Sequence, residues 1–287
     1  MTFLEIVAGS RDKLTRRRLI WRNTENLNLR KSRFSFMAIL WQQTIDGNHY
    51  EVRTAGGSVR LYRNGVNHSQ WNPKRPLSGS IWDLIMLPTL HRPFNSLEDV
   101  LILGFGAGSV GRQILELVMP KRIVGVEMDP IHLSIADGFF QCSSGFDLIA
   151  ADAVDWVNES AEKASYDVII DDLYSEEDGI PVRCVPTNAE WCKALARLLK
   201  PGGILVFNMI EPRKIKHLPI FKSSKLKKRF TETVMYRIDG YENRVIAFSE
   251  KPFDFKCLDR QLKFIKKKYP SCRLVEKRYV RSRNFKP

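Results

Sequence analysis

Residues 99–113, DVLILGFGAGSVGRQ, decide the fold, because an apolar run leads directly into three glycines and then into a helix-type sequence. The apolar run predicts a buried strand. Gly104, Gly106 and Gly108 permit a tight turn and let a ligand lie close to the backbone. The first N–H groups of the following helix have no partners within that helix. The segment therefore predicts a ligand-binding turn between a strand and a helix.

The spacing of the glycines indicates the class of ligand. A dinucleotide fingerprint needs its third glycine at position 109, where this chain has Ser109. The G-x-G-x-G spacing instead resembles the first motif of class I S-adenosylmethionine-dependent methyltransferases. We therefore expect an adenosyl cofactor at this turn.

Strand and helix sequences alternate through the centre of the chain. After residues 99–103, apolar runs predict four further strands, at 122–127, 147–151, 166–170 and 203–208. This alternation predicts a parallel sheet with helices on both faces. Two later segments, RFTETVMYRI and NRVIAFSE, predict an antiparallel pair at the edge of that sheet, which gives seven strands in all. A helical stripe over 257–269 predicts a packed terminal helix.

Carboxylates follow three of the predicted parallel strands. Glu127 lies about 20 residues beyond the glycines, where an acid can accept hydrogen bonds from both ribose hydroxyls. Asp129, before Pro130, is better explained as a helix cap. Asp152 either accepts a hydrogen bond from an adenine amino group or caps the next helix. Because Asp171-Asp172 ends another strand, we expect these acids to converge on one crevice.

The stretch from about 50 to 250 resembles the polyamine aminopropyltransferase (spermidine synthase) family and its spermidine synthase-like relatives. The matching segments are RLYRNGVNHSQ, VLILGFGAGSVGRQ, IVGVEMDP, ADA, YDVIIDDLYSEEDGIP and LLKPGGILVFNM. The resemblance implies that the glycines and Glu127 hold the aminoacyl and ribose parts of the cofactor, and that Asp152 holds the adenine. It also implies that Asp172 is the catalytic residue, which deprotonates the attacking amine.

The chain departs from the family pattern around the acceptor and the cofactor tail. The family loop Asp-Ser/Thr-Ser/Thr-Asp-Pro is here 172–176, DLYSE, so that Ser175 replaces the amine-binding aspartate. Ile81 replaces a tyrosine, while Asp83 keeps an acid two positions later. His68 replaces a glutamine, and Ala107 stands where the family often has aspartate. We expect His68 to contact the cofactor. The candidate substrate-binding residues are Asp83, Tyr174 and Glu176.

The resemblance and the strand pattern together give the expected architecture. It is an α/β protein with a Rossmann-like methyltransferase fold, a mostly parallel seven-stranded sheet, and a small N-terminal antiparallel β-domain. In the β-domain, turns are predicted at Gly56-Gly57 and Asn64-Gly65. The expected segments are a basic N-terminal extension (1–33), the small β-domain (34–76), the Rossmann-like cofactor-binding domain (77–250) and a basic C-terminal helix and tail (251–287).

The composition excludes several classes of protein. With 44% hydrophobic and 27% charged residues, the 287-residue chain is not a disordered protein. No apolar run reaches the length of a membrane-spanning helix, and the N-terminus has no secretory pattern. Five cysteines without a CxxC pair predict neither a disulfide framework nor a zinc site. We expect a cytoplasmic location and no metal.

The positive charge, +14 in total, lies at the ends and in one late segment. Residues 211–229 hold eight Lys or Arg against one acid, and residues 251–287 hold thirteen against three. We interpret these runs mainly as solvated faces. Contact with nucleic acid through them is the less favoured alternative.

We expect a spermidine synthase-like transferase. It would bind S-adenosylmethionine or its decarboxylated form and transfer an alkyl group, with methyl favoured, to a nucleophilic acceptor such as a small-molecule amine. One alternative is a true polyamine aminopropyltransferase that uses decarboxylated S-adenosylmethionine. Another is a non-catalytic adaptor whose basic tails bind nucleic acid or a protein partner. The resemblance also implies a homodimer.

Overall fold

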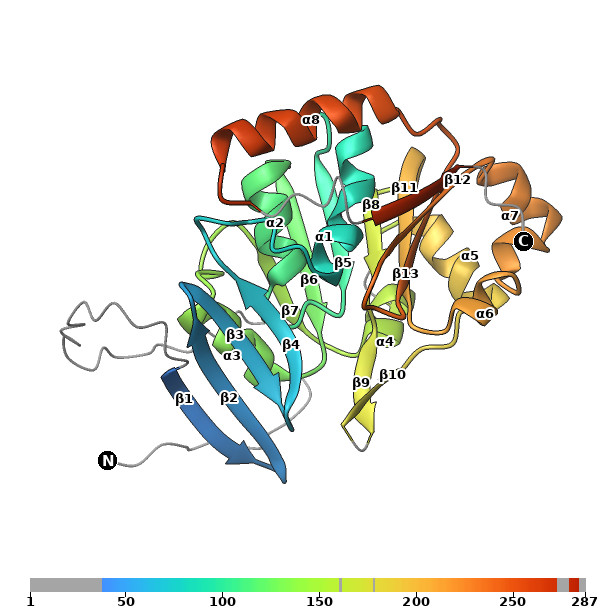
Figure 1. Cartoon of the computed structure of the whole chain (residues 1–287). Helices are drawn as coiled ribbons and strands as arrows, with labels where there is room; N and C mark the ends of the chain where they lie inside the picture. Colours follow the sequence, from blue (N-terminus) through green and yellow to red (C-terminus); the bar gives the residue numbers. More distant parts are fainter. Residues whose placement is uncertain (1–37, 160–161, 178, 273–278, 284–287) are drawn as a thin grey trace. The chain divides into compact units, whose positions relative to one another are not determined.

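The structure, a computed structural model, describes residues 38–159, 162–177, 179–272 and the backbone of strand 279–283. The expected basic extension at 1–33 lies outside the described residues, as does part of the expected basic tail. Between residues 38 and 283 the chain forms a small antiparallel sheet and a large mixed sheet, with helices packed on both faces of the large sheet (Figure 1).

The small sheet is a four-stranded meander. Its strands follow each other in chain order: β1 (Ala38–Ile45), β2 (Asn48–Ala55), β3 (Ser58–Arg63) and β4 (Val66–Trp71). Both predicted turns are present, and Asn64 and Gly65 adopt positive φ angles of 49° and 82°, as a tight hairpin turn requires. Residues alternate between the faces of the sheet, so the inner face supplies apolar side chains such as Val52 and Leu61 to the core.

The large sheet contains the seven predicted strands. They are β5 (Asp99–Leu103), β6 (Arg122–Glu127), β7 (Asp147–Ala150), β8 (Tyr166–Asp171), β11 (Leu199–Met209), β12 (Glu232–Ile238) and β13 (Arg244–Ser249), and β14 (Tyr279–Arg283) adds an eighth at one edge. The order is β14-β12-β13-β11-β8-β5-β6-β7, with β7, β6, β5, β8 and β11 parallel. Because the chain order reverses between β5 and β8, a crevice is expected beyond their carboxyl ends.

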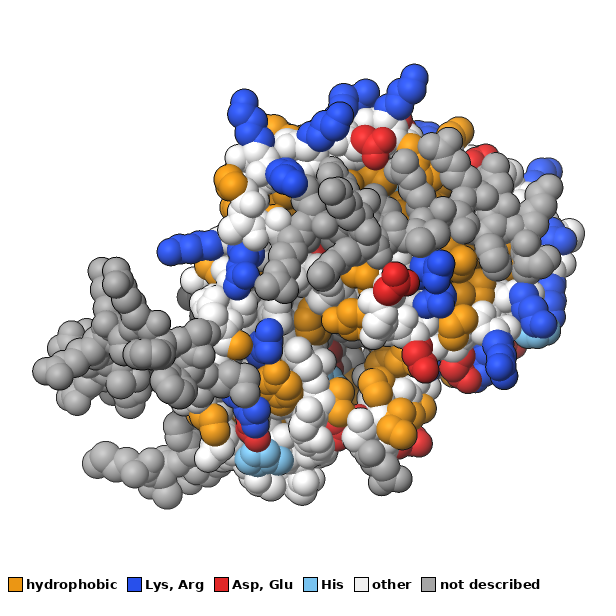
Figure 2. All heavy atoms as spheres, viewed as in Figure 1, with side chains coloured by type: hydrophobic (Ala, Val, Ile, Leu, Met, Phe, Trp, Pro, Cys, Tyr) orange, Lys and Arg blue, Asp and Glu red, His pale blue; other side chains and the backbone are white. Residues whose placement is uncertain are grey.

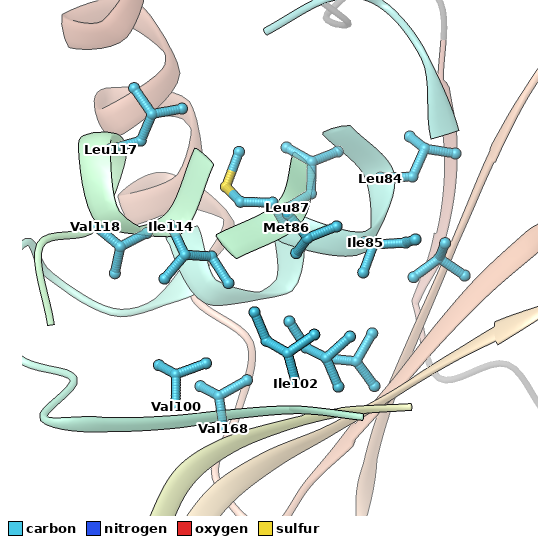
Figure 3. Close-up of a cluster of buried hydrophobic side chains, with 14 of the residues drawn as sticks. Leu84, Ile85, Met86, Leu87, Val100, Ile102, Ile114, Leu117, Val118 and Val168 are labelled. Carbon is cyan, nitrogen blue, oxygen red and sulfur yellow. The ribbon is translucent and has the colours of Figure 1, made fainter. Parts of the chain in front are cut away.

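Apolar side chains on the two faces of the sheet form two cores. On one face the sheet packs against the small sheet and against α1 (Ile81–Met86), η1 (Leu87–His91), α2 (Ser109–Leu117), α3 (Pro130–Phe139) and α8 (Phe255–Lys268). On the other face it packs against α4 (Ala153–Glu159), α5 (Ala189–Leu198), α6 (Pro212–Ile215), η2 (Pro219–Phe221) and α7 (Ser224–Arg229). Figure 3 shows Ile85 and Met86 of α1 and Ile114 of α2 above Val100 and Ile102 of β5.

The terminal helix α8 packs as its stripe predicts. Leu258, Leu262 and Ile265 are buried, while Lys and Arg side chains cover the outer side (Figure 2). Gln261 Nε2 donates to the carbonyl oxygen of Leu90 at 2.8 Å, which ties α8 to η1. Beyond β8, the strands β9 (Tyr174–Glu177) and β10 (Ile180–Arg183) form a two-stranded hairpin.

Candidate active site

A cavity of about 360 Å³ lies at the carboxyl ends of β5, β6 and β8. Residues of both sheets line it, together with α1 and the segment after β8. Seven of the ten candidate site residues line this cavity: Gly104, Gly106, Glu127, Asp152, His68, Asp172 and Tyr174. The predicted convergence of the strand-end acids is therefore present in the geometry.

The glycine turn lies so close to the residue that follows β8 that there is no room for a side chain at Gly104. Gly104 has φ +82°, and a Cβ atom there would lie 2.2 Å from the carbonyl oxygen of Asp172. Gly108, with φ +96°, is the N-cap of α2 and is not among the lining residues. A Cβ at 108 would lie 2.9 Å from both Phe105 and Cys142, so this glycine shapes the turn.

The small sheet holds the glycine turn from one side. The backbone N–H of Ala107 donates to Ser69 Oγ at 2.9 Å, and the N–H of Gln70 donates to Ser109 Oγ at 2.6 Å. Both bonds join β4 to the segment that contains the glycine turn and the start of α2. The turn therefore has its position fixed by a strand of the small sheet as well as by its own sheet.

Glu127 forms the wall next to the turn. Its Oε2 accepts from the N–H of Gly106 at 2.7 Å, and its Oε1 accepts from the N–H of Asp129 at 3.0 Å. Burial alone would raise the pKa of Glu127, but His132 and these two N–H groups outweigh it and lower the pKa. Asp129 caps α3 as predicted, through the N–H of Ile131, and also accepts from the Tyr50 hydroxyl at 2.7 Å.

Two histidines lie beside these acids. The rings of His68 and His132 are 5.1 Å apart between centroids. Burial, together with the neighbouring His132, lowers the pKa of His68 to about 4, so His68 is neutral at pH 7. His132 Nδ1 lies 3.7 Å from Glu127 Oε1, and its Nε2 lies 3.6 Å from Asp129 Oδ2.

Asp152 caps the next helix, which is one of the two alternatives that the sequence left open. Its Oδ1 accepts from the N–H groups of Val154 at 2.7 Å and Asp155 at 3.1 Å, which is a helix cap for α4. The same residue lines the cavity, as Glu127 does.

Asp172 lies at the end of β8 on the cavity wall. Its Oδ1 accepts from Asn208 Nδ2 at 2.8 Å, and Asn208 Oδ1 in turn accepts from Asn243 Nδ2 at 3.0 Å. Burial raises the pKa of Asp172 to about 6, while the bond from Asn208 opposes that rise. The carboxylate is therefore ionised at pH 7 but basic enough to accept a proton.

The neighbouring Asp171 faces away from the cavity and is fully buried. Its Oδ2 accepts from Arg183 Nη2 at 2.6 Å and from Trp191 Nε1 at 2.7 Å. Arg183 Nη1 also donates to the carbonyl oxygen of Asn208 at 3.2 Å. This buried ion pair fixes the strand end that carries Asp172.

The three substrate-binding candidates lie in different places. Tyr174 lines the cavity. Its hydroxyl already donates a hydrogen bond to the carbonyl oxygen of Asn208 at 2.7 Å. Glu176 is not among the lining residues; its carboxylate accepts from Asn64 and lies 3.8 Å from His68. Asp83 is fully buried outside the lining, where it accepts from the N–H of Gly79 at 2.6 Å.

Sequence reasoning missed the side chains that support the aspartates. Asn208 carried a signal, because it is a polar residue at the end of an apolar strand run. Arg183 and Asn243 carried none, because their contacts depend on how distant segments fold together. The far wall of the cavity is largely neutral, with Trp82, Ile210 and Tyr241 among its lining residues.

The described part of the chain contains no group of three or more His, Cys, Asp and Glu side chains that could hold a metal ion. Within those same residues, no helix has the length and apolar character needed to cross a membrane.

Comparisons with known proteins agree with this geometry. Residues 83–251 match the family described as Spermine/spermidine synthase domain. A probable polyamine aminopropyl transferase of Bifidobacterium longum is 31% identical over 134 residues, which are 46% of this chain and 28% of that protein. An eEF1A lysine and N-terminal methyltransferase homolog of Drosophila melanogaster is 26% identical over 129 residues, 42% of this chain and 19% of that protein. These matches span less than a third of either relative.

Solved structures show the same fold. A probable spermidine synthase from Corynebacterium glutamicum superposes with a TM-score of 0.59 at 18% identity, over 83% of this chain and 95% of that one. The expected Rossmann-like fold with a small antiparallel sheet is thereby confirmed.

Proposed function

Because this chain belongs to the spermine/spermidine synthase domain family, we propose that it transfers an alkyl group from an adenosyl sulfonium donor to an amine. Methyl transfer from S-adenosylmethionine is the favoured form. The observation that carries the proposal is the cavity in which the glycine turn, Glu127, Asp152 and Asp172 meet. The first three would bind the donor, and Asp172 faces the space left for the acceptor.

The binding roles follow from the chemistry of each group. Gly104 and Gly106 line the cavity, and the aminoacyl part of the donor would lie against their backbone. Glu127 would exchange its backbone partners for the ribose hydroxyls, and Asp152 would accept from the adenine amino group. His68, neutral at pH 7, would contact the donor tail as a hydrogen-bonding group without charge.

The reaction is an in-line displacement at the carbon beside the sulfonium. The amine nitrogen forms a bond to this carbon, the carbon–sulfur bond breaks, and its electron pair remains on sulfur as a neutral thioether. An acceptor amine that arrives as an ammonium must first lose a proton, which Asp172 would accept. Asn208, bonded to Oδ1 of Asp172, holds that carboxylate in place.

The preference for S-adenosylmethionine rests on position 107. Ala107 is fully buried where the family often has an aspartate. An acid there would attract the ammonium that ends decarboxylated S-adenosylmethionine, and would repel the carboxylate of ordinary S-adenosylmethionine. With alanine at 107 and a neutral His68 in the cavity lining, the carboxylate would meet less repulsion.

Calorimetric titration with each donor tests this preference. We expect S-adenosylmethionine to bind more tightly to the wild-type chain. We expect Ala107→Asp to shift the ratio of affinities at least tenfold toward the decarboxylated donor, whereas the matched neutral variant Ala107→Asn leaves the ratio unchanged. Tighter binding of the decarboxylated donor to the wild type would overturn the preference.

Aminopropyl transfer is the second candidate. It is favoured by the likeness to the Bifidobacterium longum protein and by the acids Glu176 and Glu177 near the cavity, which would attract a cationic diamine. The calorimetry above separates the two. Failure to bind either donor, combined with salt-dependent RNA binding, would instead support an adaptor.

The proposal also includes a homodimer and a cytoplasmic location. It keeps the segment boundaries 1–33, 34–76, 77–250 and 251–287. Sedimentation would test the dimer.

A further inference from the structure

A second cavity, of about 130 Å³, lies away from the candidate active site. The described residues that line it are Ala55, Ser58, Arg60, Gln70, Asn72, Arg75, Leu77 and Ser78. They belong to the small sheet and to the segment that follows it. The volume is several times the ~30 Å³ that one water molecule takes up. A small polyatomic ligand therefore has room here.

Among the described residues, the lining is positively charged and contains no carboxylate. Arg60 uses its Nε to donate to Gln70 Oε1 at 2.7 Å, and Arg75 uses Nη2 to donate to the carbonyl oxygen of Gly56 at 3.2 Å. Among the described residues, neither guanidinium has an acidic partner within 4.0 Å. Each retains further N–H groups, arranged in the planar fork that suits oxyanions.

Asp83 and Glu51, two acids in this part of the structure, have other partners than these two arginines. Asp83 lies behind Ser78 and accepts from the N–H groups of Ser78 and Gly79 and from Gln113. Arg53 stands directly opposite Arg60 across β2 and β3 and takes Glu51 as its own partner. Arg60 therefore faces a cation, and among the described residues the Glu51 carboxylate that pairs with Arg53 forms no ion pair with Arg60.

The neutral residues complete a set of donors. Asn72 is buried, with Nδ2 donating to Ser58 Oγ at 3.2 Å, which leaves the Ser58 hydroxyl proton available to a ligand. Gln70 is fixed by Arg60, and Ser78 lies at the rim. Two cationic forks and a hydroxyl suit the several acceptor oxygens of a phosphate or sulfate group.

We propose that this cavity, on the outer face of the small sheet, is a binding site for a small, doubly charged oxyanion of the phosphate class. Its position is independent of the donor cavity: in β4 the side chain of Gln70 faces this site, while Ser69 on the opposite face holds the glycine turn. The proposal therefore stands whether or not the chain transfers methyl groups.

Titration with sodium phosphate at constant ionic strength, balanced with sodium chloride, tests the site. We expect a saturable rise in the thermal midpoint, and heat of binding in calorimetry. Arg60→Gln/Arg75→Gln should weaken phosphate binding at least tenfold. The control Arg213→Gln/Lys225→Gln, which removes the same charge from exposed positions on α6 and α7, should bind phosphate as the wild type does.

A second variant keeps the test decisive if the double variant folds poorly. Ala55→Glu places a carboxylate inside the cavity, so it should raise the thermal midpoint without phosphate and abolish the response to phosphate. O-phosphoserine forms a parallel arm: binding of both compounds indicates a site for phosphate monoesters, and binding of inorganic phosphate alone indicates a site for the free ion. Equal phosphate responses in the wild type, Arg60→Gln/Arg75→Gln and Ala55→Glu would overturn the proposal.

Discussion

Asp171 and Asp172 are adjacent, yet removing their charges should change stability in opposite directions. Asp172 has a pKa raised from 3.8 to about 6, mainly by burial. A raised carboxyl pKa means that the folded state binds the proton more tightly than the unfolded state. The resulting loss of stability is absent below about pH 4, develops as the pH rises to about 6, and is constant above that.

The magnitude follows from that rise in pKa. A rise of one unit in the pKa corresponds to about 1.4 kcal/mol, so the ionised carboxylate lowers the free energy of unfolding by about 3 kcal/mol at pH 8 and by roughly half as much at pH 5. Asp172→Asn removes this penalty, and its amide oxygen can still accept from Asn208. These figures are upper bounds on the gain. The same variant should lose about 10²- to 10⁴-fold in turnover with an ammonium acceptor.

Asp171→Asn is the matched control. Its carboxylate forms a buried ion pair with Arg183 at 2.6 Å, and loss of one partner from such a pair costs about 3–5 kcal/mol. Urea unfolding, followed by tryptophan fluorescence at pH 5 and pH 8, measures both variants. The reasoning would be refuted if Asp172→Asn were no more stable than the wild type at pH 8, or if the two variants changed stability in the same direction.

Three further predictions concern the donor turn and the proton. Gly104→Ala should destabilise the fold by about 3 kcal/mol or more and abolish donor binding, because its Cβ would lie 2.2 Å from a carbonyl oxygen; the control Gly138→Ala, whose Cβ meets nothing within 4 Å, should be neutral or stabilising in thermal melts. Glu127→Gln should weaken donor binding about 10- to 100-fold in calorimetry, and an unchanged dissociation constant would remove Glu127 from the site. The value of kcat/KM for an amine acceptor should rise with pH through about 6, where Asp172 ionises; a rate that falls over that range would contradict the base role.

The large sheet was predictable because its information is local. Short apolar runs such as 99–103 and 122–127, separated by helix-type sequences, specify strands, and the glycines specify the turn between strand and helix. The convergence of Glu127, Asp152 and Asp172 followed from a general property of parallel strands. The spacing along the chain was sufficient for this part of the site.

The rest depended on contacts between distant segments. The family resemblance suggested that Asp83 is an acceptor-binding acid, but tertiary packing places it among Gly79, Ser78 and Gln113. The Asp171–Arg183 pair could not be inferred, because the hairpin that carries Arg183 had no periodic signal. Likewise, no local pattern indicated that Ser69 would bond the glycine turn.

The bonds from β4 to the glycine turn limit how this protein can be shortened. The segment that carries the family match begins at residue 83, after the strand that supplies Ser69 and the N–H of Gln70. A fragment that begins at that boundary would keep Glu127, Asp152 and Asp172. It would lose the two hydrogen bonds by which β4 holds the glycine turn. If the proposed function holds, the smallest fragment with a complete site would therefore have to include the four strands of the small sheet, because β4 helps to hold the glycine turn.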